Sequence, residues 1–232
     1  MGGLGPIATA YFYELIVKMT DAERDQDHIE MLIHSKPQIP DRTDYILGRS
    51  ADSPLPDILN VGKALAEMGA DYIAIPCITA HYFQEQLARG IKAPIINIVK
   101  ETAAYLKDCD IERAGIMATE GTIYAEIFQE ELKSLGIMPV VPSLKQQENI
   151  SFLIYNCVKA NQPVSLEKFA EAAEELRCNG AQVIILGCTE LSLIKREHKL
   201  GSGFIDAMEV LAMRCIQLCG AKLKNEYSRL IS

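Results

Sequence analysis

The sequence lacks the features that mark membrane, secreted and nucleic-acid-binding proteins. No apolar run approaches the ~18 residues of a membrane span, and residues 1–12 lack the basic and apolar regions of a signal peptide. The net charge is −8 and no basic stretch is present, so a surface for nucleic acid is not expected. We therefore predict a cytoplasmic protein that binds neither a membrane nor nucleic acid.

Cysteine and histidine are present, but not in the patterns of disulfide frameworks or metal sites. The seven cysteines are an odd number without a C-x-x-C pair, and the four histidines do not cluster with cysteines and carboxylates. We expect no bound metal, and we interpret most of the cysteines as small core residues of a reduced protein.

The chain does have enough apolar residues to form a large core, since 49% of its 232 residues are hydrophobic. Near-continuous apolar runs predict buried parallel strands at residues 72–76, 114–118 and 183–187. Amphipathic segments predict helices at residues 57–68, 123–135 and 166–177. This alternation predicts an α/β protein with parallel sheets flanked by helices.

The two halves of the chain resemble each other. Residues 69–77 (GADYIAIPC) and 180–188 (GAQVIILGC) share Gly, Ala, Ile and Cys at an offset of 111, and residues 5–14 and 121–130 share four residues at an offset of 116. Two matches in the same order favour a duplicated unit. We predict two pseudo-symmetric Rossmann-like domains, the first from residues 1–108 plus 206–232 and the second from residues 109–205.

The repeat also indicates an irregularity at the start of the first unit. In the second unit, an apolar strand leads into residues 119–121, but almost nothing precedes the corresponding Gly2. The first domain is therefore expected to lack its opening strand, or to fill that place in its sheet differently.

One cysteine follows the predicted strand of each unit, Cys77 in the first and Cys188 in the second. The carboxyl ends of parallel strands hold ligands, and the helix that follows offers free N–H groups that bind anions and lower a thiol pKa. Two such ends related by pseudo-symmetry would face one cleft. A cysteine at the end of one buried strand is more often a packing residue, but its recurrence in both units favours a chemical role.

Two opposed thiols suit the inversion of a stereocentre. One thiolate removes a proton from one face of a carbon atom, and the other thiol returns a proton to the opposite face. N–H donors around the substrate's carboxylate would stabilise the carbanion between these steps. The pair therefore predicts racemase chemistry, with Cys77 and Cys188 as acid and base.

The sequence also resembles the aspartate/glutamate racemase family in five blocks that occur in the family order. They are residues 2–9 (GGLGPIAT), 40–43 (PDRT), 76–81 (PCITAH), 118–122 (ATEGT) and 187–190 (GCTE). The resemblance implies an active site between two α/β domains, racemisation without pyridoxal phosphate or another cofactor, and a homodimer. One departure is Ile78, where the family usually has asparagine.

The resemblance also implies roles for residues other than the cysteines. Arg42 matches an arginine that binds the substrate's side-chain carboxylate, and Lys159 resembles a lysine of aspartate-specific members. Four threonines match positions that bind the substrate's α-carboxylate or amino group: Thr79, Thr119, Thr122 and Thr189. Without the resemblance, Arg42 and Lys159 would be interpreted as exposed cations.

Two further residues near the cysteines have competing interpretations. His81, four residues after Cys77, could polarise that thiol, but an ordinary helix-capping role is favoured. Glu190, two residues after Cys188, could contact the substrate's ammonium group or be an acidic residue of a first helical turn.

The favoured function is cofactor-independent racemisation of an amino acid, with aspartate or glutamate as the substrate. A second hypothesis keeps the paired cysteines but changes the reaction, as in maleate isomerases, hydantoin racemases and malonate decarboxylases. A third is a non-catalytic member that binds a small acid, which the missing opening strand would favour and the retained cysteines oppose.

Overall fold

The computed structural model describes residues 1–232 and contains two parallel sheets. The larger sheet has the order β4-β3-β5-β6, and the smaller one pairs β1 with β2. The strand bounds are β1 (Ile73–Ala74), β2 (Ile95–Ile96), β3 (Arg113–Ala118), β4 (Met138–Val140), β5 (Val183–Gly187) and β6 (Phe204–Asp206). The predicted α/β class with parallel sheets is confirmed.

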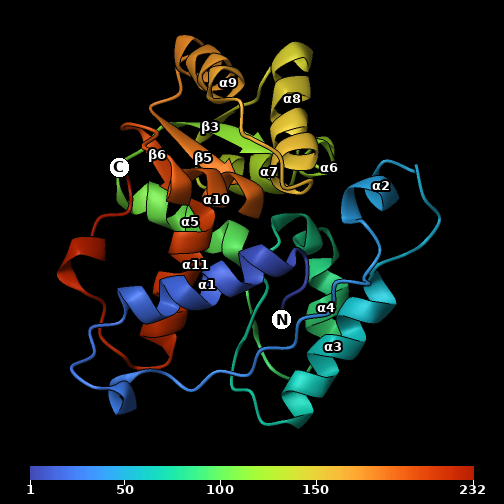
Figure 1. Cartoon of the computed structure of the whole chain (residues 1–232), viewed down its shortest axis with the longest axis vertical. Coiled ribbons are helices and arrows are strands. Elements are labelled where there is room, and N and C mark those ends of the chain that lie inside the picture. The colour runs from blue at the N-terminus through green and yellow to red at the C-terminus, as the bar shows by residue number, and fades with distance from the viewer.

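Helices surround both sheets (Figure 1). The α-helices are α1 (Pro6–Met19), α2 (Arg42–Ile46), α3 (Leu55–Glu67), α4 (Gln84–Gly90), α5 (Ile98–Asp108), α6 (Glu120–Tyr124), α7 (Ile127–Ser134), α8 (Leu144–Ser151), α9 (Leu166–Cys178), α10 (Thr189–Glu197) and α11 (Ala207–Leu218). Four shorter or irregular helices are η1 (Asp25–Asp27), η2 (Ile78–Phe83), η3 (Phe152–Val158) and η4 (Asn225–Tyr227). None of the helices is long and apolar enough to cross a membrane.

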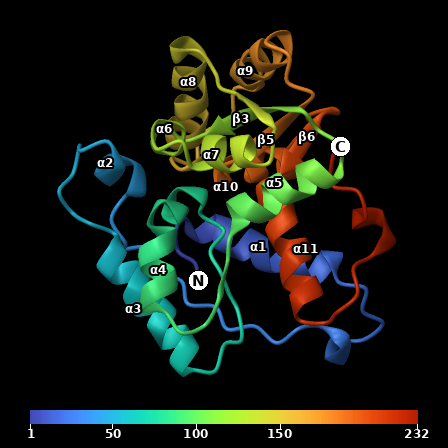
Figure 2. The same cartoon turned by 180° about the vertical axis from the view of Figure 1, so that it is seen from behind.

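The four-stranded sheet is buried on both faces, as its apolar strands predict. Alternate side chains divide between two cores: Ile116 and Ile185 pack with α1, α5 and α11, whereas Met117 and Ile184 pack with α8 and α9. Figures 1 and 2 show α8 and α9 on one side of this sheet and α5 and α11 on the other. The sheet thereby fixes the end of β5, where Cys188 follows.

The first unit repeats this arrangement with shorter strands. Gly69 and Gly180 both adopt left-handed backbone conformations, with φ of 92° and 90°, just before β1 and β5. Glycine reaches this region without a Cβ clash, so both turns require it. Cys77 and Cys188 then follow β1 and β5 at matching places, as the repeat predicts. The division into residues 1–108 plus 206–232 and 109–205 stays a prediction.

Two predicted elements differ from the structure. The strand at residues 72–76 pairs only over Ile73–Ala74, which lie beside Ile95–Ile96 of β2. The helix at residues 123–135 is broken, because Glu126 has a φ of 52° and separates α6 from α7. At the start of the first unit, Gly2 forms a single parallel bridge with Ser35.

Candidate active site

Cys77 and Cys188 lie in one narrow cavity between the two units. Cys77 ends the segment after β1 and begins η2, and Cys188 ends the segment after β5 and begins α10. Their exposed fractions are 7% and 6%, and both line a space of about 290 Å³ that includes its open mouth. The pseudo-symmetric strands therefore bring both thiols to the same place.

Glu190 controls the charge around Cys188. The Cys188 Sγ donates a hydrogen bond to Glu190 Oε2 at 2.8 Å, and the Thr189 hydroxyl donates to the same oxygen at 2.9 Å. Burial, the Glu190 charge and this hydrogen bond together raise the pKa of Cys188 well above its ordinary value. The expectation that the helix N-terminus lowers this thiol pKa is wrong, because desolvation and the carboxylate outweigh the α10 N–H groups.

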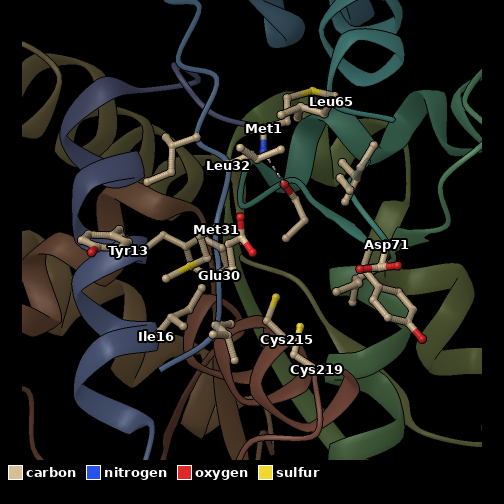
Figure 3. Close-up of a pocket in the computed structure, with 18 of the residues that line it drawn as sticks. Met1, Tyr13, Ile16, Glu30, Met31, Leu32, Leu65, Asp71, Cys215 and Cys219 are labelled. Carbon is tan, nitrogen blue, oxygen red and sulfur yellow. Dashed lines mark hydrogen bonds between the residues drawn. The ribbon is translucent and has the colours of Figure 1, made fainter. Parts of the chain in front are cut away.

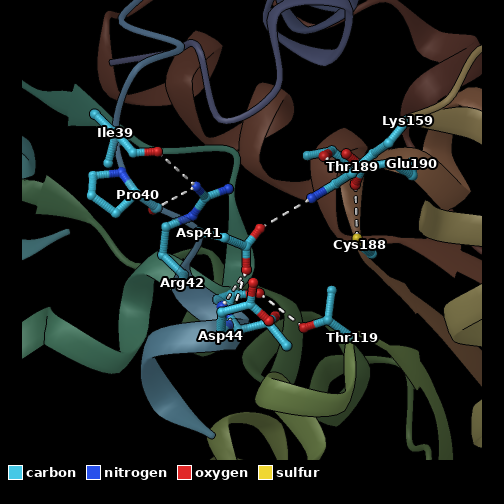
Figure 4. Close-up of polar contacts among 12 residues, drawn as sticks. Ile39, Pro40, Asp41, Arg42, Asp44, Thr119, Lys159, Cys188, Thr189 and Glu190 are labelled. Carbon is cyan, nitrogen blue, oxygen red and sulfur yellow. Dashed lines mark hydrogen bonds and ion pairs between the residues drawn. The ribbon is translucent and has the colours of Figure 1, made fainter. Parts of the chain in front are cut away.

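Arg42 supplies a buried cation on the opposite side of the cavity (Figure 4). Its Nη1 donates to the carbonyl oxygen of Pro40 at 3.0 Å, while its Nε is buried without a hydrogen-bond partner. Burial opposes the charge, but the neighbouring Cys77 and Asp41 raise the pKa of the guanidinium above its ordinary value. A buried donor without a partner is costly, so a carboxylate ligand would be bound strongly here.

Lys159 is the second cation of the cavity, and it is held by two residues that the sequence reasoning missed. Its Nζ lies 3.5 Å from Asp41 Oδ2 and 4.5 Å from the centre of the Tyr155 ring. Asp41 also caps α2 by accepting hydrogen bonds from the N–H groups of Thr43 and Asp44. A carboxylate ligand would compete with Asp41 for Lys159.

A π-helix places Tyr155 and Lys159 together. The segment η3 has the wider π-helical winding, and the N–H of Lys159 bonds to the carbonyl oxygen of Ile154, five residues earlier. Such segments often occur at functional sites. The sequence contained a signal for each of the two missed residues. Tyr155 lies four residues before Lys159, at helical spacing, and Asp41 stands beside Arg42 in the PDRT block.

Three predicted threonines form a closed group of hydroxyls. Thr79 from the first unit lies 3.0 Å from both Thr119 and Thr122 of the second, and those two are also 3.0 Å apart. Thr79 and Thr119 line the cavity, but Thr122 lies behind them and does not. The Thr122 hydroxyl therefore positions the other two, and a direct substrate contact is not expected for it.

All other predicted site residues line the cavity: Cys77, Cys188, Arg42, Thr79, Thr119, Lys159, Thr189 and Glu190. His81 does not line it and caps no helix: its ring nitrogens contact the carbonyl oxygen of Ile75 and the side chain of Gln84, so neither of its two interpretations is confirmed. The remaining five cysteines also lie outside it. No group of three His, Cys, Asp or Glu side chains is placed to hold a metal ion.

The cavity has the groups that a small zwitterion with carboxylates would need. Arg42 and Lys159 can bind carboxylates, while Glu190 and Asp41 can accept hydrogen bonds from an ammonium group. The thiols of Cys77 and Cys188 can exchange protons with an atom placed between them.

Comparisons with known proteins show which family and fold the chain resembles. Residues 1–215 match the family model described as Asp/Glu/Hydantoin racemase. The structure of Picrophilus torridus aspartate racemase is 31% identical, with a TM-score of 0.84, covering 97% of this chain and 95% of that one. The broad specificity amino-acid racemase RacX of Bacillus subtilis (strain 168) is 27% identical over 91% of this chain and 93% of its own length. An aspartate racemase homologue from Pyrococcus horikoshii OT3 shares the fold, with a TM-score of 0.76 at 21% identity and coverage of 94% and 96%.

Proposed function

The chain belongs to the Asp/Glu/Hydantoin racemase family, and we propose that it interconverts the enantiomers of an acidic amino acid by proton transfer between Cys77 and Cys188. The observation that carries this proposal is the position of both thiols in one buried cavity with Arg42 and Lys159. Aspartate is the first substrate to test, because the 31% identical relative is an aspartate racemase; glutamate is the second. A homodimer and a cytoplasmic location stay predictions.

The two thiols have opposite electrostatic surroundings. The cation of Arg42 lies beside Cys77, whereas the carboxylate of Glu190 accepts a hydrogen bond from Cys188. Cys188 therefore keeps its proton in the resting enzyme and is ready to act as the acid, and we assign the role of base to Cys77 in this direction. Cys77 removes the proton from Cα of one enantiomer, and Cys188 donates its proton to the opposite face. The reverse reaction starts from the other protonation state.

The remaining cavity residues bind the substrate. Arg42 and Lys159 bind its side-chain carboxylate, and Lys159 exchanges its contact with Asp41 for one with the substrate. We assign to Thr79, Thr119 and Thr189 the hydrogen bonds to the α-carboxylate, where negative charge develops after Cα loses its proton; Thr189 would exchange its hydrogen bond to Glu190 for one to the substrate. These contacts favour a dicarboxylate over an amino acid with a neutral side chain.

Isotope exchange tests the proposal directly. Incubation with L-aspartate in D₂O, without added pyridoxal phosphate, is expected to produce D-aspartate and to place deuterium at Cα, since Cys188 delivers a solvent-derived deuteron. The measurements are the Cα proton signal by NMR and the optical rotation, repeated with L-glutamate. If the folded protein exchanges Cα of neither amino acid, the proposed racemisation is wrong.

The charge of Glu190 predicts a pH effect. Glu190→Gln removes an anion that raises the pKa of Cys188, so the thiol should lose its proton at lower pH than in the wild type. In the direction in which Cys188 acts as base, activity needs its thiolate, so the rise of kcat/KM with increasing pH should begin at lower pH than in the wild type. In the direction in which Cys188 acts as acid, activity needs its thiol, so the fall of kcat/KM with increasing pH should also begin at lower pH. Both limbs are thus expected to shift in the acidic direction, measured as kcat/KM for each enantiomer against pH.

A matched control separates this effect from the loss of any buried carboxylate. Glu209 is largely shielded from water, with its side chain 13% exposed, but it pairs with Lys195 and does not line the cavity of the cysteines. Glu209→Gln should leave both limbs in place. Unshifted limbs in a folded Glu190→Gln protein would show that Glu190 does not control the charge of Cys188.

A further inference from the structure

Two further cavities lie outside the space between the thiols, and only one of them adjoins it. The first lies between α1, α3 and α11 and is lined mostly by apolar residues, among them Ile16, Leu65 and Cys215 (Figure 3). It shares no lining residue with the catalytic cavity. The second shares five residues with it, namely Leu4, Asp41, Arg42, Lys159 and Glu190.

We call the second of these cavities the outer chamber. Residues 3–8, which lead into α1, form one of its walls, and Ile39, Val158 and Leu193 add apolar surface. Measured with their open mouths, the outer chamber has a volume of about 820 Å³ and the catalytic cavity one of about 290 Å³. The charged residues of the site therefore lie between a narrow space that holds the thiols and a wider space with apolar walls.

The start of α1 offers free hydrogen-bond donors to the outer chamber. The N-cap residue Gly5 makes no side-chain hydrogen bond, and Pro6 has no N–H group. The N–H groups of Ile7 and Ala8 have no acceptor in the protein, and both residues line the chamber. Such a helix end attracts anions through its free N–H groups and the helix dipole.

Arg42 independently indicates an anion at the same place. Its side chain is buried and lines both spaces, and its Nε has no hydrogen-bond partner. Lys159 also lines both spaces, with a side chain that is 30% exposed. A carboxylate in the outer chamber would therefore lie between the first turn of α1 and two cations.

The start of α1 is also close to the reacting groups. A Cβ atom at Gly5 would lie 3.8 Å from Oε1 of Glu190, and Oε2 of the same carboxylate accepts the hydrogen bond from Cys188 at 2.8 Å. A substrate whose Cα lies between the thiols can therefore reach the outer chamber with a side chain of a few methylene groups. The side-chain carboxylate of aspartate, one methylene from Cα, is too close to Cα to do so.

We propose that the outer chamber binds the far end of acidic side chains longer than that of aspartate, so that the substrates include amino dicarboxylates such as 2-aminoadipate. This inference rests on the proposed racemisation, since it keeps Cα between the two thiols. The methylene groups pack on Ile39 and Leu193. The terminal carboxylate accepts hydrogen bonds from the N–H groups of Ile7 and Ala8, with Arg42 beside it.

A pair of substrates tests the role of the terminal carboxylate. The side chains of 2-aminoadipate and norleucine have the same number of carbon atoms, but only the first ends in a carboxylate. In D₂O, kcat/KM for Cα–H exchange is expected to be about 10–100-fold higher for L-2-aminoadipate than for L-norleucine, the usual contribution of hydrogen bonds to a charged group. Equal values for the two substrates would show that no anion is bound in the outer chamber.

Reversing the charge at Ile7 tests where the carboxylate lies. The Ile7 side chain is 66% exposed, so charged replacements should not disturb the fold. Ile7→Lys should raise the ratio of kcat/KM for 2-aminoadipate to that for aspartate, and Ile7→Glu should lower it, each by about tenfold. Leu144→Glu is the matched control, because Leu144 is 88% exposed in the first turn of α8 and lines neither space. This control should leave the ratio unchanged.

Failure of this inference and failure of the racemisation give different results. Exchange of aspartate without exchange of 2-aminoadipate would overturn the inference and leave the racemisation intact. Equal effects of both Ile7 variants on the two substrates would show that the outer chamber is only an entry path. If no amino acid exchanges, the racemisation is wrong, and protection of Cys77 and Cys188 against alkylation then measures binding alone. In that case 2-aminoadipate should protect Ile7→Lys more strongly than Ile7→Glu, and equal protection would overturn the outer-chamber site.

Discussion

Replacing either Cys77 or Cys188 by alanine is expected to abolish the interconversion of D- and L-aspartate in both directions. A positioned acid or base contributes about 10²–10⁴-fold to a proton transfer. Each cysteine acts as base in one direction and as acid in the other, so each single variant loses both directions. The measurement is the rate of D-aspartate formation from the L-enantiomer and the reverse, after circular dichroism has shown that the variant is folded.

Cys157 offers a matched control for this prediction. It is as buried as Cys188, with an exposed fraction of 2%, and packs in the same apolar core, but it does not line the catalytic cavity. Cys157→Ala should therefore cost packing energy and keep racemase activity. If Cys157→Ala loses as much activity as Cys188→Ala, or if either catalytic variant keeps a wild-type rate, the two-thiol mechanism is wrong.

The sequence predicted the frame of the site because that frame depends on local patterns. Apolar runs identified β3 and β5, and the internal repeat placed Cys77 and Cys188 at the ends of corresponding strands. Ligands bind at the carboxyl ends of parallel strands, so a cysteine at that place in each of the two sheets indicated a shared site. The resemblance to the family added Arg42, Lys159 and four threonines, and all six except Thr122 line the cavity with the thiols.

The rest depended on contacts that no local pattern specifies. The hydrogen bond between Cys188 and Glu190 reverses the expected direction of the thiol pKa, and it depends on one side-chain rotamer in a buried turn. The contact between Lys159 and Asp41 joins residues 118 positions apart, through a π-helical segment whose winding the sequence did not indicate. The left-handed Glu126 likewise breaks a helix that periodicity alone would continue.

These contacts change how the cysteine pair is understood. The repeat predicts two equivalent thiols, but Arg42 lies on one side of the cavity and Glu190 on the other. A racemase must work in both directions, but its two cysteines do not need equal surroundings. Catalysis requires only that one of the pair is a thiolate while the other is a thiol. The unequal charges therefore determine which enantiomer can react with the resting protonation state of the enzyme. They do not change the equilibrium between the two enantiomers.

Replacing Arg42 by lysine is expected to lower kcat/KM for aspartate by about 10²-fold. Lysine keeps the charge but lacks the planar fork that binds a carboxylate through two hydrogen bonds, and its Cε methylene replaces the buried Nε, so that donor is lost. A loss of about 2.7 kcal/mol corresponds to this factor. The measurement is Cα–H exchange in D₂O with aspartate and, in parallel, with asparagine, which has no side-chain charge.

The ratio of the two substrates identifies what Arg42 does. If it binds the side-chain carboxylate, Arg42→Lys reduces exchange with aspartate much more than exchange with asparagine, and KM for aspartate rises. Arg49→Lys is the matched control, because Arg49 is exposed, pairs with Glu120 and does not line the cavity; it should change neither rate. Equal losses for both substrates would instead mean that Arg42 acts mainly on the neighbouring Cys77. The preference for a dicarboxylate would then have to come from Lys159.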